Sequence, residues 1–165
     1  LLLNYIFMKI LIVEDNPLYT EVLKQNLNTS GYSDVTTFSD GEGCIDRVDG
    51  ETDVILLDYE LGEGKFNGIE IFKEIRRKYK QVKIILISSQ EDVKVAVEGL
   101  KLGAFDYIIK GKYAMDNVLN SLHKISKIKQ RQLERQHSKK IKGLFYLGIV
   151  AFTILITITL LVKLN

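Results

Sequence analysis

Cysteine is almost absent from this sequence, which has a single copy, Cys44. One cysteine excludes an intramolecular disulfide, so the fold must be held by its core, and a reducing compartment fits this usage. We expect Cys44 to be a small apolar side chain on a helix. Repeats and low-complexity tracts are also absent, which leaves one globular domain as the expected organisation.

Acidic residues are nearly missing from the last 45 positions. Residues 121–165 carry nine Lys/Arg and one acid, net +8, whereas residues 1–120 carry 14 Lys/Arg and 20 Asp/Glu, net −6. The pI near 8.5 therefore does not describe a basic globule. Because the positive charge is confined to the tail, no nucleic acid partner is expected.

Charge is missing altogether from residues 143–162. Twenty residues of helix span about 30 Å, the thickness of a hydrocarbon core, so the run predicts a transmembrane helix. The rival interpretation is a buried core helix, but a domain this small cannot surround a helix that is apolar on every face.

A basic segment precedes this run. Residues 124–142 hold eight Lys/Arg against Glu134 alone, and only Lys163 lies beyond the run. The positive-inside rule then predicts that the soluble domain and the N-terminus lie on the cytoplasmic face, and the expected location is the bacterial inner membrane. Because three residues remain after the run, the run is expected to be a tail anchor. Residues 127–142 would form a basic helical stalk beside anionic membrane lipid, which explains the charge better than DNA binding does, and 163–165 a short tail.

The first seven residues lack the features of a signal peptide, because they have no basic leader and no small-residue cleavage site. Met8 follows them directly. We expect residues 1–7 to be an unstructured N-terminal extension.

From Met8 onward, short apolar runs alternate with helix-like stretches, which predicts an α/β domain with a parallel sheet and helices on both faces. The expected strands are 9–13, 34–38, 53–57, 83–87 and 105–109, and the expected helices are 17–29, 41–49, 68–79, 91–102 and 114 onward. The second strand, with two threonines, is expected at an edge. Asn16 is expected to cap the first helix, Gly31 and Gly103 to follow helix ends, and the domain to cover residues 8–126.

Polar residues gather where the expected strands end. Glu14 and Asp15 follow the first strand, Asp58 the third, Ser88 and Ser89 the fourth, and Lys110 the fifth. The carboxyl ends of parallel strands meet at one edge of the sheet, where ligands bind. Three neighbouring carboxylates need a counter-charge, and oxygen ligands suit Mg²⁺. The remaining lysine suits a ligand that is itself anionic.

Four stretches, "KILIVEDN", "VILLDYELG", "IILISSQ" and "DYIIKG", resemble the four blocks of the response-regulator receiver domain of two-component signalling. The resemblance covers about Met8 to Ser126. It implies a flavodoxin-like, doubly wound sheet of five parallel strands in the order 2-1-3-4-5, with five helices.

The resemblance also implies roles for individual residues. Asp58 would accept a phosphoryl group from a sensor histidine kinase or a histidine phosphotransfer protein. Mg²⁺, or Mn²⁺, would be held by Asp15, Asp58 and the backbone carbonyl of Glu60, with Glu14 acting mainly through water. Lys110 would pair with the phosphoryl group, Ser88 would donate its hydroxyl to a phosphoryl oxygen, and Tyr107 would move inward as a switch when Ser88 shifts. Glu60 and Gln90 would flank the mouth of the site and modulate it.

One position departs from the family pattern. The family usually has a proline in a cis bond after the strand 5 lysine, whereas Gly111 follows Lys110 here. A cis bond before a non-proline residue is costly, so either the surroundings enforce it or the bond is trans and the lysine is held less firmly.

The leading hypothesis is a stand-alone, membrane-anchored response regulator. It would have only self-phosphorylation and self-dephosphorylation chemistry, so it is not expected to be an enzyme, and its output would pass to an unknown protein through the helix 4, strand 5 and helix 5 face. The alternative is a pseudo-receiver, an interaction module that phosphorylation does not regulate. A phosphatase with an aspartyl nucleophile would need a second aspartate where Glu60 stands.

Overall fold

The computed structural model describes residues 7–62, 66–89 and 93–164, without the side chains of 154, 155 and 157–164. The predicted extension, residues 1–7, therefore lies outside the described residues except for Phe7. The chain divides into two compact units, residues 1–126 and residues 127–165.

Over the described ranges, five strands alternate with five helices, as the sequence predicts. The strands are β1 (Lys9–Val13), β2 (Val35–Phe38), β3 (Thr52–Asp58), β4 (Lys83–Ser88) and β5 (Asp106–Ile109). The helices are α1 (Pro17–Thr29), α2 (Gly41–Arg47), α3 (Gly68–Lys78), α4 (Val93–Lys101) and α5 (Ala114–Leu164).

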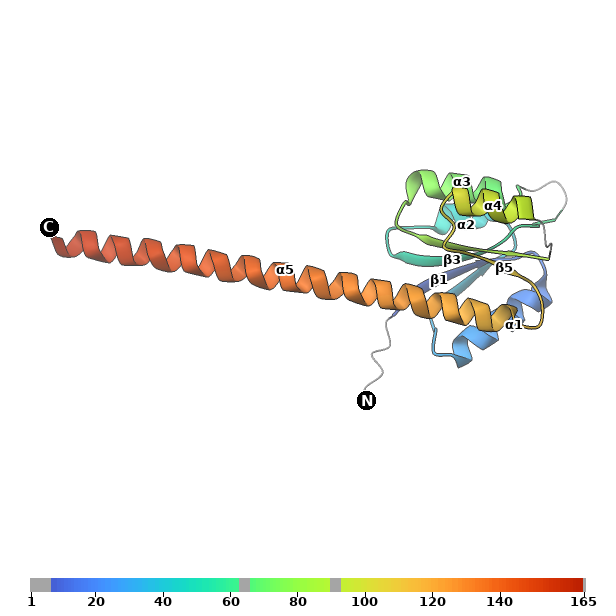
Figure 1. Cartoon of the computed structure of the whole chain (residues 1–165), viewed down its shortest axis with the longest axis horizontal. Helices are drawn as coiled ribbons and strands as arrows, with labels where there is room; N and C mark the ends of the chain where they lie inside the picture. The colour runs from blue at the N-terminus through green and yellow to red at the C-terminus, as the bar shows by residue number, and fades with distance from the viewer. Residues whose placement is uncertain (1–6, 63–65, 90–92, 165) are drawn as a thin grey trace. The chain divides into compact units, whose positions relative to one another are not determined.

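All the strands are parallel and their order is β2-β1-β3-β4-β5, which confirms the predicted topology and the edge position of β2. Helix α1 and the first part of α5 cover one face of the sheet, while α2, α3 and α4 cover the other (Figure 1). The central strand β3 is buried from Val54 to its last residue, Asp58. The Asp58 carboxylate therefore lies at the carboxyl end of a strand whose side chains are buried.

Each face of the sheet has its own core cluster. On the first face, Leu23 and Leu27 of α1 pack with Val118, Leu122 and Ile125 of α5. On the other face, Cys44 of α2 and the apolar residues Ile69, Phe72 and Ile75 of α3 pack against the sheet. Cys44 is fully buried, and burial raises the pKa of its thiol to about 12, so it is the apolar residue that the sequence predicts.

The ends of the helices follow the predicted signals. Asn16 caps α1, where its side-chain oxygen accepts hydrogen bonds from the N–H groups of Leu18 and Tyr19. Gly31 and Gly103 have positive φ angles of 94° and 88°, which suit glycine after a helix. The Asn16 cap fixes where α1 begins, and the short segment between β1 and α1 contains Glu14 and Asp15.

The described residues of the second unit, 127–164, belong to α5. In the described part of the chain, no helix is both long enough and apolar enough to cross a membrane. The structure thus does not confirm the transmembrane helix predicted over residues 143–162. Part of that segment, the side chains of 154, 155 and 157–162, lies outside the described residues.

Helix α3 begins in direct contact with the end of β3. The Gly68 N–H donates to the carbonyl of Tyr59 at 2.9 Å. A Cβ at Gly68 would lie 2.4 Å from the carbonyl oxygen of Asp58 and 2.8 Å from the Cα of Tyr59. Because both neighbours are backbone atoms, only glycine allows this close approach.

We therefore expect Gly68→Ala to lower the free energy of unfolding of the full chain by about 1–3 kcal/mol, since the overpacked backbone must shift. Urea denaturation followed by circular dichroism measures this. Gly50→Ala is the matched control, because a Cβ at Gly50 meets nothing within 4 Å. Equal stabilities for the two variants would contradict the packing of α3 against β3.

Candidate functional site

Three acidic side chains meet at the carboxyl end of the sheet. Glu14 and Asp15 follow β1, and Asp58 is the last residue of β3. One carboxylate oxygen from each lies within 4.8 Å of the others. Glu14 and Asp58 are buried, whereas Asp15 is exposed. The structure thus brings together the three carboxylates that the sequence predicts.

Lys110, which follows β5, lies between the two buried carboxylates. Its Nζ is 2.7 Å from Glu14 Oε2 and 2.8 Å from Asp58 Oδ2. The two acidic side chains are 2% exposed and that of Lys110 is 20% exposed, so solvent screens these ion pairs only weakly.

The bond between Lys110 and Gly111 is trans, since no cis peptide bond occurs among the described residues. The lysine nevertheless contacts both carboxylates, so the glycine does not keep it from the site.

Burial and pairing act in opposite directions on these groups. Burial raises the pKa of Asp58 and of Glu14 above the usual carboxyl values, although Lys110 opposes the rise in both. Burial also lowers the pKa of Lys110, but the hydrogen bonds to Asp58 and Glu14 raise it more, and the result is a raised pKa. The lysine is therefore firmly protonated at neutral pH.

The backbone fixes these side chains by hydrogen bonds at the strand ends. The Lys110 N–H donates to the Ser88 carbonyl at 2.7 Å, which ties the residue after β5 to the last residue of β4. The Glu60 N–H donates to Asp58 Oδ1 at 3.2 Å, and the Asn16 N–H donates to Glu14 Oε1 at 3.2 Å. Each buried carboxylate thus has a backbone donor as well as the lysine.

The charges leave room for a divalent cation. Three carboxylates and one ammonium leave two negative charges within a few ångströms, and every acidic donor is an oxygen, as hard cations prefer. Gly62 has φ +67°, and a Cβ there would lie 3.0 Å from Asp15 Oδ2. The glycine thus keeps the space beside the exposed carboxylate open. The donor set fits Mg²⁺.

The other predicted site residues lie around this cluster. Ser88 is fully buried, and Tyr107 is half-buried against the core cluster on the α2 and α3 face. The Glu60 carboxylate accepts a hydrogen bond from the Ser89 hydroxyl, so these residues meet across the strand ends. Gln90 lies outside the described residues.

Tyr19 of α1 is a site neighbour that the sequence reasoning missed. The Nζ of Lys110 lies 4.7 Å from the centroid of its ring. The available signal was spacing: Tyr19 follows Asp15 by four residues, at the start of a helix whose cap was predicted correctly. Helical spacing suggests that Tyr19 lies near Asp15, but it does not show that Lys110, 91 positions later, is the contact partner of the Tyr19 ring.

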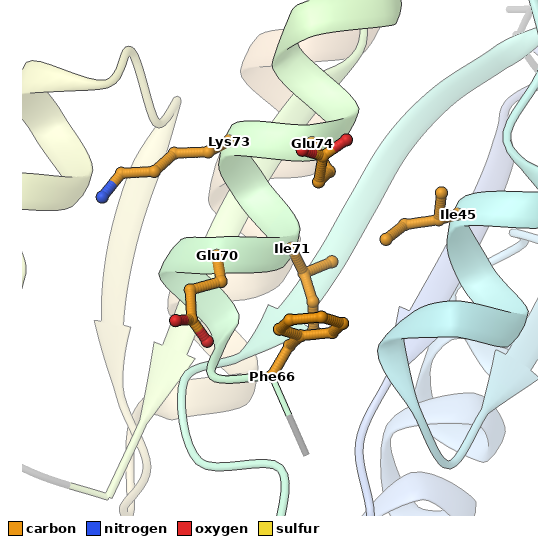
Figure 2. A pocket seen from close by; sticks show the side chains of 6 residues that line it. All are labelled: Ile45, Phe66, Glu70, Ile71, Lys73 and Glu74. Carbon is orange, nitrogen blue, oxygen red and sulfur yellow. The ribbon is translucent and has the colours of Figure 1, made fainter.

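A separate hollow of about 410 Å³ lies between α2 and α3. Its lining residues are Ile45, Phe66, Glu70, Ile71, Lys73 and Glu74 (Figure 2). Lys73 points away from Ile45 and pairs with Glu98 of α4 at 3.0 Å. None of the predicted site residues that the structure describes lines this hollow, so it is separate from the carboxylate cluster.

Comparisons with known proteins point to one family. The chain is 39% identical over 103 residues to the alkaline phosphatase synthesis transcriptional regulatory protein PhoP of Bacillus subtilis. The match covers 62% of this chain and 42% of that protein, so the chain spans about two fifths of the length of this curated relative.

Solved structures share the fold. The response regulator TrrA from Thermotoga maritima, solved in complex with Mg²⁺ and BeF, is 29% identical with a TM-score of 0.63, covering 72% of this chain and 99% of that one. A receiver domain protein from Methanospirillum hungatei is 22% identical with a TM-score of 0.66, covering 76% and 98%, and shows the fold alone. The family model of the response regulator receiver domain matches residues 10–123. With this match over most of its length, the chain belongs to the response regulator receiver domain family.

Proposed function

We propose that the chain is a Mg²⁺-dependent phosphoacceptor in which Asp58 receives a phosphoryl group from a sensor histidine kinase or a histidine phosphotransfer protein. The observation that carries this proposal is the contact of Lys110 Nζ with Asp58 Oδ2 at 2.8 Å, beside three clustered carboxylates. Asp58 lies at the carboxyl end of the sheet beside an ammonium group, so an anionic group attached to it would contact a cation.

The proposed transfer forms an acyl phosphate. A carboxylate oxygen of Asp58 attacks the phosphorus of the donor phosphohistidine, a P–O bond forms and the P–N bond breaks, and the imidazole nitrogen keeps the bonding electron pair. The Lys110 ammonium, 2.8 Å from Asp58, then lies within reach of a phosphoryl oxygen and offsets its charge. Bound Mg²⁺ would supply the additional positive charge that lets one anion approach another.

Asp15 and Asp58 are the side chains best placed to hold the cation directly. Asp15 is exposed beside Gly62, and Asp58 keeps the oxygen that does not contact Lys110. Glu14 is already bonded to Lys110 and to the Asn16 N–H, which favours contact through water. The backbone carbonyl of Glu60 would complete the set, and Mn²⁺ suits the same donors.

Phosphorylation would be transmitted from Ser88 to the face formed by α4, β5 and α5. The Ser88 hydroxyl would move to a phosphoryl oxygen, and the half-buried Tyr107 would follow into the space released. Exposed apolar side chains on α4 and β5 support this face as the contact for a downstream protein; they are Val93, Val97, Leu100 and Ile109. Because the domain only accepts and loses the group, we propose no other enzymatic activity.

Incubation of the full chain with acetyl phosphate and Mg²⁺ tests the phosphoacceptor. We expect intact mass spectrometry to show one added phosphoryl group, which Asp58→Asn abolishes because an amide is not a nucleophile toward phosphorus. Removal of the metal with EDTA should also abolish it. The matched control is Asp116→Asn, at an exposed acid in the first turn of α5, which should leave the modification unchanged.

The same experiment separates the alternative. A folded wild-type chain that gains no phosphoryl group with Mg²⁺, while TrrA gains one in parallel, would identify a pseudo-receiver and exclude the proposed function. Modification that survives in Asp58→Asn would place the acceptor elsewhere.

We also propose that residues 143–162 anchor the chain in a membrane, with the receiver domain on its cytoplasmic face. The support comes from the sequence: these residues carry no charge, and residues 124–142 carry eight Lys/Arg against one acid. Basic residues beside a membrane span are retained in the cytoplasm and attract anionic lipid. The described residues contain no helix that meets the criteria for a span.

We expect the full chain, expressed in bacteria, to remain in the membrane pellet after alkaline carbonate extraction. Adding Phe152→Arg and Ile156→Arg should release it, since each central arginine costs about 2.5–3.5 kcal/mol of insertion free energy. Gln132→Arg with Gln136→Arg is the matched control and should stay in the pellet. A wild-type chain that carbonate extracts completely would contradict the anchor.

A further inference from the structure

Tyr19 packs its ring against the Lys110 ammonium. It lies in the first turn of α1, where its N–H donates to the capping oxygen of Asn16 at 3.1 Å. The ring centroid is 4.7 Å from Lys110 Nζ, which is inside the range of a cation–π contact. The ring is half-buried and belongs to the edge of the core cluster beneath α1 and α5.

Two carboxylates and the Tyr19 ring contact the Lys110 ammonium. Glu14 and Asp58 each supply one oxygen at hydrogen-bond distance, and the ring of Tyr19 supplies an apolar face 4.7 Å from the ammonium nitrogen. A carboxylate attracts a cation from any direction, whereas a ring face attracts it only along the ring normal. The Tyr19 ring therefore restricts the position of the Lys110 ammonium more than the two carboxylates alone would.

The Lys110 N–H is bonded to the Ser88 carbonyl at 2.7 Å, which fixes the backbone of this residue but not the direction of its long side chain. Gly111 follows it directly, and a Cβ at Gly111 would meet nothing within 4 Å. No side chain at position 111 packs on Lys110, and the four-carbon stem of a lysine is flexible, so contacts at the charged end set the direction of the side chain.

We propose that Tyr19 is a positioning residue that holds the Lys110 ammonium over Asp58 through the face of its ring. This inference rests on the proposed function, since the held ammonium is the group that receives the phosphoryl charge. Tyr19 itself does not touch the reacting atoms. Burial raises the pKa of its hydroxyl above the usual value, so the ring brings no competing negative charge at neutral pH.

Two variants separate the ring from the hydroxyl. Tyr19→Phe keeps the aromatic face, and we expect it to be phosphorylated by acetyl phosphate with Mg²⁺ at nearly the wild-type rate. Tyr19→Leu removes the face, and we expect a rate roughly three- to thirtyfold lower, the range that a cation–π contact supports. Tyr32→Leu is the control for lost packing, because Tyr32 lies beyond the other end of α1 against the same core cluster.

A second measurement does not depend on phosphorylation. In the full chain labelled with ¹³C-lysine, the ring current of Tyr19 should shift the Lys110 ε-methylene signal upfield, and an assigned spectrum shows this directly. The shift should persist in Tyr19→Phe and Tyr32→Leu and vanish in Tyr19→Leu.

The phosphorylation rate and the ring-current shift test different claims. If the wild-type chain is not phosphorylated but the ring-current shift is present and depends on the ring at position 19, the proposed function is wrong and the contact stands. If Tyr19→Leu is phosphorylated as fast as Tyr19→Phe, or if the Lys110 signal is unshifted in the wild type, the positioning role is overturned. A loss of rate in Tyr32→Leu equal to that in Tyr19→Leu would assign the effect to packing and also overturn it.

Discussion

The Lys110 ammonium between Glu14 and Asp58 is the interaction on which the site depends. Each buried carboxylate would be costly without a partner, because a charge in a dry layer loses its hydration. The lysine lies 2.7 Å from one and 2.8 Å from the other and so offsets both. Among the described residues the site thus sets this ammonium against three acids, which keeps it negative enough to take up a divalent ion.

The sheet makes this arrangement possible because it collects distant residues at one edge. Glu14, Asp58 and Lys110 are separated by 44 and 52 positions in the chain, yet each follows or ends a parallel strand. Right-handed crossovers return every strand in the same direction, so all the carboxyl ends meet. Gly68 and Gly62 then supply the close approaches that side chains would prevent, one beside Asp58 and one beside Asp15.

Much of this architecture was predictable from the sequence. The apolar runs predicted every strand end to within one residue, and the parallel topology alone required the acids and the lysine to converge. Helix α2 ends at Arg47 rather than at residue 49, because Val48 adopts an extended backbone conformation. Helix ends of this kind depend on one residue's backbone angles, which periodicity does not encode.

Contacts between side chains from distant elements were not predictable. The ring of Tyr19 over Lys110 and the hydrogen bond from Ser89 to Glu60 both depend on rotamers and on the exact spacing of packed elements. Gly111 illustrates the same limit, since the sequence left open whether a trans bond would hold the lysine away from Asp58. The structure has the trans bond and the contact together, since Lys110 is held at both ends, by its N–H on the Ser88 carbonyl and by its ammonium on the two carboxylates.

A crystal structure of the full chain grown with Mg²⁺ and beryllofluoride tests the central claim most directly. Beryllofluoride occupies the position of a phosphoryl group on a carboxylate. We predict that it binds an oxygen of Asp58, with Lys110 Nζ in hydrogen-bond contact with a fluorine and Mg²⁺ held by Asp15 and Asp58. Beryllofluoride absent from Asp58 at saturating concentration, or a lysine turned out into solvent beside it, would contradict the account.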